Sequence, residues 1–300
     1  MKQMKSVPKA FNKQQYDLLS ILASFAKMNP LWSYFGLTFL TSWGVMFLFV
    51  GPSHFPSTPS EAEDLLPLMV ALTLLGPSVA GLLMRYILDG NVKQVTSRLD
   101  WKFWYCAPLI LIPFSVGIAL LCIYFLTGST NYIPIIFFQS SHEISSLLLI
   151  GVIYATAAGF FEEIGWSFAT VYLRKTMNTF YAGLTLGIIW GLWHFQVAVI
   201  GSGTENGEFS FELFLPWLVW NILVLPAYRV LMFHVHERCN GSITAMAIMH
   251  GSLTASLPLI LAPKAQGRHL ATFYFTYGIE LILVNMVIAL IPNHVQRRKI

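Results

Sequence analysis

Apolar residues in this chain are gathered into long runs separated by short polar stretches. A helix needs about 20 apolar residues to cross the ~30 Å hydrocarbon core of a bilayer. Eight runs come close to that length or exceed it, and we expect each to form a membrane-spanning helix. The predicted spans are residues 31–50, 66–88, 105–127, 146–173, 180–200, 213–233, 241–261 and 270–291.

The composition agrees with this pattern. Of the 300 residues, 56% are hydrophobic and only 11% are charged, whereas a soluble domain has about 25% charged residues. The sequence predicts an all-α, polytopic membrane helix bundle over residues 31–291 as one domain. Residues 1–30 form an N-terminal segment that either lies as an interfacial helix or extends the first span, and residues 292–300 form a basic tail.

The distribution of charge predicts the orientation. Of the 18 Lys and Arg residues, all but Lys264 and Arg268 fall on one side of the eight predicted spans. Cytoplasmic loops of membrane proteins carry an excess of Lys and Arg. Both termini are therefore expected in the cytoplasm, and the protein in the plasma membrane if its host is prokaryotic. The opposite side holds Glu61, Glu63, Asp64, Glu143, Glu205, Glu208 and Glu212.

Two adjacent carboxylates interrupt the fourth predicted span. Glu162 and Glu163 lie about ten residues, or ~15 Å of helix, before its basic end at Arg174. A charge at this depth costs roughly 2.5–3.5 kcal/mol on insertion scales, so ionisable residues there are usually functional. Adjacent helical residues point about 100° apart. We therefore expect one carboxylate to face substrate or water while the other is held by a partner.

Two histidines lie in other predicted spans. His250 roughly matches the glutamates in depth, whereas His194 lies somewhat deeper if its span starts near Phe180, and a start near Gly183 would largely remove the difference. His194 follows a stripe of Gly183, Gly187 and Gly191, whose four-residue spacing is typical of close helix packing. His250 lies in the seventh predicted span, with Thr254 one turn later on the same face. Each histidine alone is also compatible with a hydrogen-bonded packing role.

Carboxylate and imidazole together can activate water, since a glutamate accepts the proton and imidazole stabilises developing negative charge. The sequence contains no HExxH zinc helix. No cofactor is expected, and no metal. A divalent metal, if one were bound, would be held by Glu162, His194 and His250.

The residues around these groups resemble the motifs of the CPBP family, the intramembrane CAAX-type proteases. The family patterns EExxxR, FxxxH and HxxxN or HxxxD are similar to EEIGWS at 162–167, WGLWH at 190–194 and HGSLT at 250–254. The resemblance covers about one third of the chain, residues 150–256. It implies a protease whose three motifs each lie on their own membrane helix, with a lipidated or membrane-embedded peptide as substrate. We expect no nucleic acid among the partners.

The resemblance also implies roles for individual residues. Glu162 would activate the attacking water, Glu163 would support it, and His194 would belong to the catalytic cluster. His250 and Thr254 would form the oxyanion site. The sequence departs from the family at Ser167, where arginine is usual, so that Glu163 lacks its cation within one turn. It departs again at Thr254, where Asn or Asp is usual.

Three functions are compatible with these observations. The first is an intramembrane endopeptidase that acts on a prenylated, membrane-embedded or small secreted peptide. The second is a catalytically silent relative that acts as a regulatory or immunity protein, as the two departures would suggest. The third is a transporter that uses Glu162, Glu163 and Glu280 as coupling carboxylates. For a protease, we expect substrate access in the cytoplasmic half of the bundle.

Two more polar residues lie inside predicted spans. Glu280 in the eighth span and Asn221 in the sixth are expected to make structural contacts between helices. The three cysteines, Cys106, Cys122 and Cys239, are scattered and predict no disulfide framework.

Overall fold

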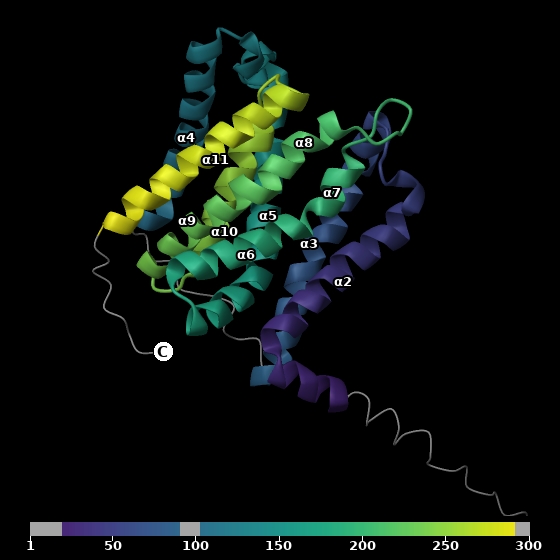
Figure 1. Cartoon of the computed structure of the whole chain (residues 1–300), viewed down its shortest axis with the longest axis vertical. Coiled ribbons are helices and arrows are strands. Elements are labelled where there is room, and N and C mark those ends of the chain that lie inside the picture. Colours follow the sequence, from purple (N-terminus) through teal and green to yellow (C-terminus); the bar gives the residue numbers. More distant parts are fainter. Residues whose placement is uncertain (1–19, 91–102, 292–300) are drawn as a thin grey trace, which may run out of the picture.

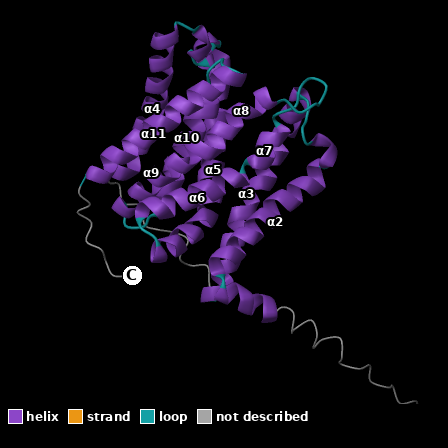
Figure 2. Ribbon diagram, in the orientation of Figure 1, coloured by secondary structure: helices purple, strands orange, loops and turns teal. Residues whose placement is uncertain are grey.

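The computed structural model describes residues 20–90 and 103–291, and within these ranges it contains helices and no β-strand. The helices run up and down as one bundle (Figures 1 and 2). The prediction of an all-α helix bundle is confirmed. The apolar helices are those of an integral, multi-pass membrane protein.

The bundle is built from long helices, two of which contain a π-helical turn. The elements are α2 (Pro30–Val50), α3 (Pro59–Asp89), α4 (Phe103–Thr127), α5 (Ser141–Thr176), α6 (Thr179–Trp193), α7 (Phe195–Ile200), α8 (Phe211–Val219), the π-helix η5 (Trp220–Val224), α9 (Leu225–Arg238), α10 (Ile243–Ala255), the π-helix η6 (Ser256–Ile260) and α11 (Gly267–Leu290). Short 3-10 turns lie at Pro52–His54, Thr130–Tyr132 and Ile135–Phe138.

Seven of the described helical segments are long and apolar enough to cross a membrane, compared with eight predicted. The difference is the predicted span at 241–261, where the α-helix covers only Ile243–Ala255 and then passes into the π-turn η6. The predicted fifth span is divided at His194, between α6 and α7. The predicted sixth span is one continuous helix of α8, η5 and α9.

Side-chain caps explain where several helices begin. The Ser140 hydroxyl accepts from the backbone N–H of Glu143, and the Glu143 carboxylate accepts from the backbone N–H of Ser140, at 3.4 and 2.7 Å. This capping box starts α5 five residues before the predicted span, because capping stabilises a helix even where its first turn is polar. Thr58 and Glu61 start α3 in the same way.

One end of the bundle, here called the acidic end, contains the starts of α3, α5, α8 and α11. Its connections are joined by hydrogen bonds. Ser57 N–H donates to the Ile200 carbonyl at 3.1 Å, and Ile135 N–H donates to the Ala262 carbonyl at 2.8 Å. The seven acidic residues that the sequence placed opposite the basic side lie in or next to these starts.

The other end, here called the basic end, contains the ends of α3, α5, α9 and α11. Arg174 at the end of α5 forms an ion pair with Glu237 of α9. The Arg238 guanidinium donates to the Ile288 carbonyl of α11 at 3.0 Å. In Figure 1 α11 runs from the upper part of the bundle down to its left edge, where its basic end lies.

Small residues allow the helices of the bundle to approach closely. A side chain on Gly183, Gly187 or Gly191 would meet backbone atoms of the η5–α9 helix, within 2.0–2.8 Å. The prediction that this glycine stripe allows close packing is confirmed. Gly165 of α5 packs in the same way on Pro77 of α3, whose carbonyl oxygen would lie 2.1 Å from an added Cβ.

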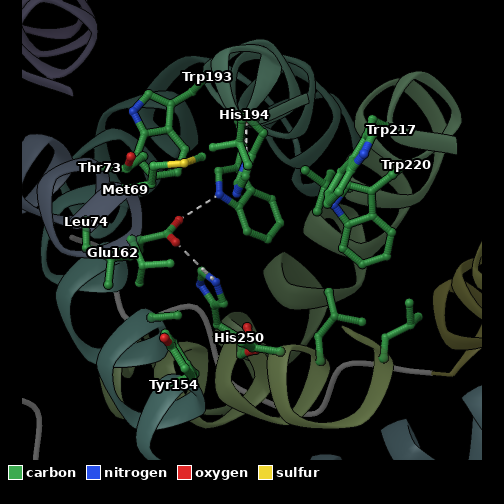
Figure 3. Close-up of a pocket in the computed structure, with 18 of the residues that line it drawn as sticks. Met69, Thr73, Leu74, Tyr154, Glu162, Trp193, His194, Trp217, Trp220 and His250 are labelled. Carbon is green, nitrogen blue, oxygen red and sulfur yellow. Dashed lines mark hydrogen bonds and ion pairs between the residues drawn. The ribbon is translucent and has the colours of Figure 1, made fainter. Parts of the chain in front are cut away.

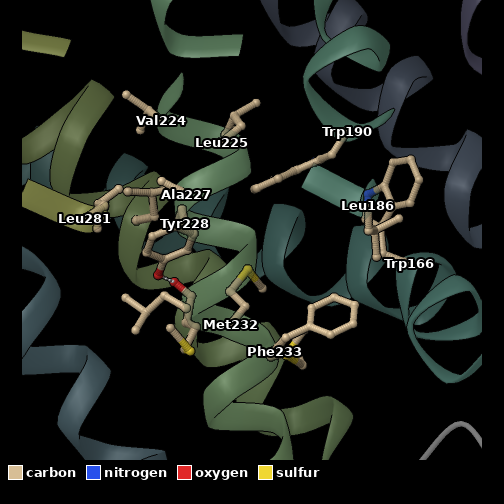
Figure 4. Close-up of a cluster of buried hydrophobic side chains, with 14 of the residues drawn as sticks. Trp166, Leu186, Trp190, Val224, Leu225, Ala227, Tyr228, Met232, Phe233 and Leu281 are labelled. Atoms are coloured by element: carbon tan, nitrogen blue, oxygen red, sulfur yellow. Dashed lines mark hydrogen bonds between the residues drawn. The ribbon is translucent and has the colours of Figure 1, made fainter. Parts of the chain in front are cut away.

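Three of the arginines that were counted as loop charges are buried; Arg238 is the last residue of α9, and the other two lie inside their helices. Arg229 of α9 is 0% exposed and Arg85 of α3 is 8% exposed. Both belong to the interior rather than to the basic surface, and this corrects the charge assignment made from the sequence. Buried aromatic and aliphatic side chains surround this part of the bundle, among them Trp166, Leu186, Trp190, Met232 and Phe233 (Figure 4).

Candidate functional site

Helix α5 brings both sequence-predicted carboxylates into the bundle. Glu162 is 3% exposed and Glu163 is 0% exposed. They point toward different neighbours, because successive residues of a helix are rotated by about 100°. Glu162 lines a cavity, whereas Glu163 is not among the residues that line it. The two carboxylates therefore have separate environments.

Glu163 is held by a cation from another helix. Arg229 Nη1 lies 2.9 Å from each carboxylate oxygen of Glu163. The expectation that Glu163 lacks a cation is wrong, since the positive charge comes from α9 instead of from position 167. Ser167 itself accepts a hydrogen bond from Arg85 Nη2 of α3 at 2.9 Å.

Glu163 also fixes the orientation of His250. His250 Nδ1 lies 2.9 Å from Glu163 Oε1. An ionised carboxylate can only accept a hydrogen bond, so Nδ1 carries the proton in this contact. The other ring nitrogen, Nε2, then faces the cavity, 3.6 Å from Glu162 Oε1.

Glu162 is positioned by two indole groups. Trp190 Nε1 donates to Glu162 Oε2 at 2.8 Å, and Trp166 Nε1 donates to the same oxygen at 3.1 Å. Both donors engage Oε2, which leaves Oε1 facing His250. Charge-assisted hydrogen bonds of this kind are stronger than neutral ones and also orient the carboxylate.

His194 lies at the break between α6 and α7. Its Nδ1 is 2.9 Å from the Trp190 carbonyl oxygen. A carbonyl only accepts, so Nδ1 donates here and Nε2 is left for another partner. The ring packs edge-on against Trp193, with centroids 4.7 Å apart. His194 therefore lines the cavity together with Glu162, and its own contacts are with Trp190 and Trp193.

The cavity has a volume of about 250 Å³ and gathers residues from six helical segments. Glu162, His194, His250 and Thr254 all line it. Figure 3 shows Glu162 and His250 pointing toward one another across it, with Trp217 and Trp220 on the opposite wall. Apart from the polar groups near Glu162, the walls are mostly apolar and aromatic.

The cavity extends from Glu162 toward the acidic end. On α5 its lining residues are Tyr154, Ala158 and Glu162, all on the Ser141 side of the helix. The sequence had placed substrate access in the half of the bundle next to the basic end. The structure places the cavity in the other half, because large buried side chains fill the space below Glu162.

Thr254 lines the cavity, but its hydroxyl is engaged within its own helix. Thr254 Oγ1 donates to the His250 carbonyl at 3.1 Å. A hydroxyl has a single proton, so in this rotamer Thr254 has none to offer an oxyanion. Thr254 lies close to His250, as its one-turn spacing predicts. Its hydroxyl proton, however, points to the His250 carbonyl and not into the cavity.

The other polar residues of the predicted spans lie apart from this site. Neither Glu280 nor Asn221 lines the cavity. The Asn221 side chain makes no hydrogen bond with any described residue, so its predicted interhelical bond is absent there. Asn285 provides such a bond instead, donating to the Ala227 carbonyl at 2.8 Å.

The described residues offer no ready metal centre. Within 20–90 and 103–291, no three His, Cys, Asp or Glu side chains are grouped so as to hold an ion. The alternative metal set of Glu162, His194 and His250 shares the cavity without converging on one point.

Sequence reasoning missed three residues that position the site. Arg229 was counted with the loops although it lies four residues inside the predicted sixth span, where a charge is itself a functional signal. Trp166 is one helical turn from Glu162, a spacing that permits side-chain contact. For Trp190, only the fold brings the indole to Glu162.

No protein-family model matches this chain. Among curated proteins, a stretch of 87 residues is 31% identical to CAAX prenyl protease 2 of Methanococcus maripaludis. The stretch is 29% of this chain and 24% of that protein, so the chain matches about a quarter of the relative's length. The chain is thus similar, over part of its length, to a protein of the CAAX protease type.

Proposed function

We propose that this protein is an intramembrane endopeptidase of the CAAX-protease type, in which Glu162 activates water to hydrolyse a peptide bond. The observation that carries the proposal is the arrangement of the cavity. Glu162, His194 and His250 come from three different helices and line the same buried, largely apolar space. Partial similarity to a CAAX prenyl protease supports the same reading.

The residues have complementary tasks in such a reaction. Glu162 Oε1 accepts a proton from water while the water oxygen attacks the carbonyl carbon of the scissile bond. The proton then passes to the amide nitrogen as the C–N bond breaks. Trp190 and Trp166 hold Glu162 Oε2, so the carboxylate keeps its orientation through both steps.

Glu163 and Arg229 are assigned to positioning His250. With Nδ1 donating to Glu163, His250 can present Nε2 to the tetrahedral intermediate. When Nε2 is also protonated, it donates to the oxyanion. Glu162 is then neutral, because it holds the proton taken from water, and the charges of Glu163, Arg229, His250 and the oxyanion sum to zero. A neutral cluster of this kind lowers the cost of burying ionised groups. His194 lies across the cavity from His250 (Figure 3) and is assigned to the same catalytic cluster.

The cavity suits an apolar group next to the scissile bond. Trp193, Trp217 and Trp220 form much of its wall. Such a surface binds a hydrophobic side chain or an isoprenoid, and it supports a lipidated or membrane-embedded peptide as substrate. A metal or other cofactor is not required by the chemistry proposed for these residues.

One observation favours a second function, that of a catalytically silent relative that binds a membrane partner. The Thr254 hydroxyl donates to the His250 carbonyl, and threonine has no amide group that could donate to an oxyanion in its place. Removing a donor to an oxyanion can lower the rate by about 10²–10³. In this alternative, the cavity binds a peptide without cleaving it.

Cleavage of a panel of quenched-fluorescent prenylated and non-prenylated peptides by detergent-purified protein tests the proposal. We expect Glu162→Gln to abolish turnover, and chelator to leave turnover of the unaltered protein unchanged. Glu280→Gln is the matched control, because Glu280 is a carboxylate within a membrane span and does not itself line the cavity. Equal turnover by Glu162→Gln and the unaltered protein would contradict the proposal.

The same peptides distinguish a protease from a catalytically silent relative. A silent relative binds peptide but releases it intact, so the peptide would protect a cysteine introduced into the cavity wall, as in Tyr154→Cys, from labelling without producing fragments. Loss of turnover on addition of chelator, restored by a divalent metal, would contradict the metal-free mechanism while retaining the protease.

A further inference from the structure

Most residues that line the cavity lie in the half of their helix nearer the acidic end, and Glu162, Leu225 and His250 lie just past the midpoint of theirs. On α3 the lining residues are 69–74 of Pro59–Asp89, and on α11 only Tyr274 takes part, one third along the helix. On the helix formed by α10 and η6, the lining begins at His250 and continues to Leu257. The α6–α7 segment contributes residues from Trp190 to Val197.

The cavity extends from Glu162 part of the way toward the acidic end. From Glu162 to Tyr154 the helix rises by about 12 Å. The lining residue Val197 is only three residues from the end of α7, and Leu257 is three residues from the end of η6. Tyr154, Trp217 and Val70 are half-buried rather than buried, in contrast to the catalytic carboxylate.

The space between Glu162 and the basic end is filled. One turn below Glu162, Trp166 is 0% exposed, and Ala169 and Leu173 continue the buried face of α5. Met232 and Phe233 of α9 pack into the same region (Figure 4). The ion pair of Glu163 and Arg229 closes this side with side chains that are 0% exposed. A peptide could pass here only if the core opened.

The acidic end also carries a charge of its own. Its described residues include seven carboxylates, most of them exposed, and two cations. The carboxylates are Glu61, Glu63, Asp64, Glu143, Glu205, Glu208 and Glu212, and the cations are Lys264 and Arg268. A cluster of one sign raises the local concentration of oppositely charged ligands over about a Debye length, or ~8 Å at physiological ionic strength.

We infer that the substrate reaches Glu162 from water at the acidic end, opposite the basic helix ends, and that it is a peptide of net positive charge with an apolar residue at the cleavage point. This inference rests on the proposed function for its substrate class. Together with the orientation predicted from the Lys and Arg distribution, it places the accessible face of the site outside the cytoplasm.

Cysteine labelling tests the route without requiring catalysis. Cys106, Cys122 and Cys239 are first replaced by alanine. Tyr154→Cys then places a thiol on the cavity wall, and Thr176→Cys places one at the basic end of the same helix, where Thr176 is exposed. A membrane-impermeant maleimide is applied to intact spheroplasts and to inverted membrane vesicles from cells that express the full chain.

We expect Tyr154→Cys to be labelled in spheroplasts and not in inverted vesicles, and Thr176→Cys to show the reverse. Labelling of both cysteines from one side would overturn the inference. An exchange of the two labelling patterns would put the cavity on the cytoplasmic side and would also overturn the inference. Labelling of Tyr154→Cys only by a membrane-permeant maleimide would show a route through the lipid and overturn it too.

Protection of Tyr154→Cys tests the charge of the substrate. The probes are two synthetic peptides with the same apolar residues, one flanked by lysines and one by glutamates. We expect at least tenfold better protection by the lysine peptide at low salt, with the difference shrinking in high salt. Equal protection by the two peptides would overturn the charge preference. Because labelling needs no turnover, a protein that fails the cleavage assay can still pass this test.

Discussion

Arg229 and Glu163 form a buried ion pair across 66 positions of sequence, with Arg229 Nη1 at 2.9 Å from both carboxylate oxygens. The same guanidinium lies over the ring of Trp190, 4.4 Å from its centroid. Trp190 in turn donates to Glu162. One arginine from α9 therefore contacts Glu163 directly, and it also contacts Trp190, the indole that donates to Glu162.

This relationship predicts a large effect of Arg229→Met. The substitution leaves the Glu163 charge buried without its cation, which typically costs about 3–5 kcal/mol. We expect a marked drop in the thermal unfolding temperature of the detergent-purified protein. The double variant Arg229→Met with Glu163→Gln removes both charges, and we expect it to recover part of that loss. Additive losses in the double variant would show that the pair is not coupled.

Trp190→Phe is expected to lower activity with little loss of stability. Phenylalanine keeps an aromatic ring beneath Arg229 but removes the N–H that holds Glu162. A hydrogen bond to a charged group contributes about 1.5–3 kcal/mol, which corresponds to roughly 10–100-fold in kcat. The measurements are kcat for the peptide that the unaltered protein cleaves fastest and the thermal unfolding temperature of each protein.

Trp193→Phe is the matched control for that substitution. Trp193 lines the same cavity, and its Nε1 makes no hydrogen bond with any described residue. We expect its kcat to stay much closer to that of the unaltered protein. If both variants lost activity equally, the effect would belong to the shape of the cavity and not to the bond with Glu162.

The close packing of α5 on α3 predicts that Gly165→Ala is destabilising. An added Cβ would lie 2.1 Å from the carbonyl carbon and oxygen of Pro77. Overpacking of this kind costs about 1–3 kcal/mol or prevents folding. Gly36→Ala in α2 is the control, since an added Cβ there meets nothing within 4 Å. We expect Gly36→Ala to match or exceed the unaltered protein in thermal unfolding.

Thr254 provides a test of the oxyanion assignment that the family resemblance implies. Because its hydroxyl donates to the His250 carbonyl, Thr254→Val should keep kcat within about threefold, a change of under 1 kcal/mol. Thr254→Asn adds an amide donor beside His250, and we expect kcat to rise. A fall of about 100-fold in Thr254→Val would mean that the hydroxyl turns to the substrate during the reaction.

Some features of the site could be predicted because they depend on local periodicity. The run lengths gave the helices, and the depth of Glu162 and His250 along their spans put these two at a similar level. The 100° rotation between neighbours predicted that one carboxylate would face the cavity and the other a partner. Each of these inferences needs only the geometry of a single helix.

The partners could not be predicted in the same way. Ser167 suggested an unpaired Glu163, yet the cation comes from α9, because a helix bundle brings together residues that lie far apart in sequence. The π-turns η5 and η6, which border the cavity, leave no signature in the apolar pattern. The sequence suggested substrate access from the basic half, whereas the cavity extends toward the acidic end, and which large side chains fill the space on the basic side of Glu162 depends on packing between helices.

The sequence by itself determined that this is a bundle of apolar helices with carboxylates and imidazoles held at membrane depth. The pattern of runs and the cost of buried charge are properties of the chain that any packing must respect. Only the tertiary structure decided that Arg229 pairs with Glu163, that two tryptophans hold Glu162, and that the cavity extends toward the acidic end. These depend on how side chains from different helices fill a shared volume, and no single helix contains that information.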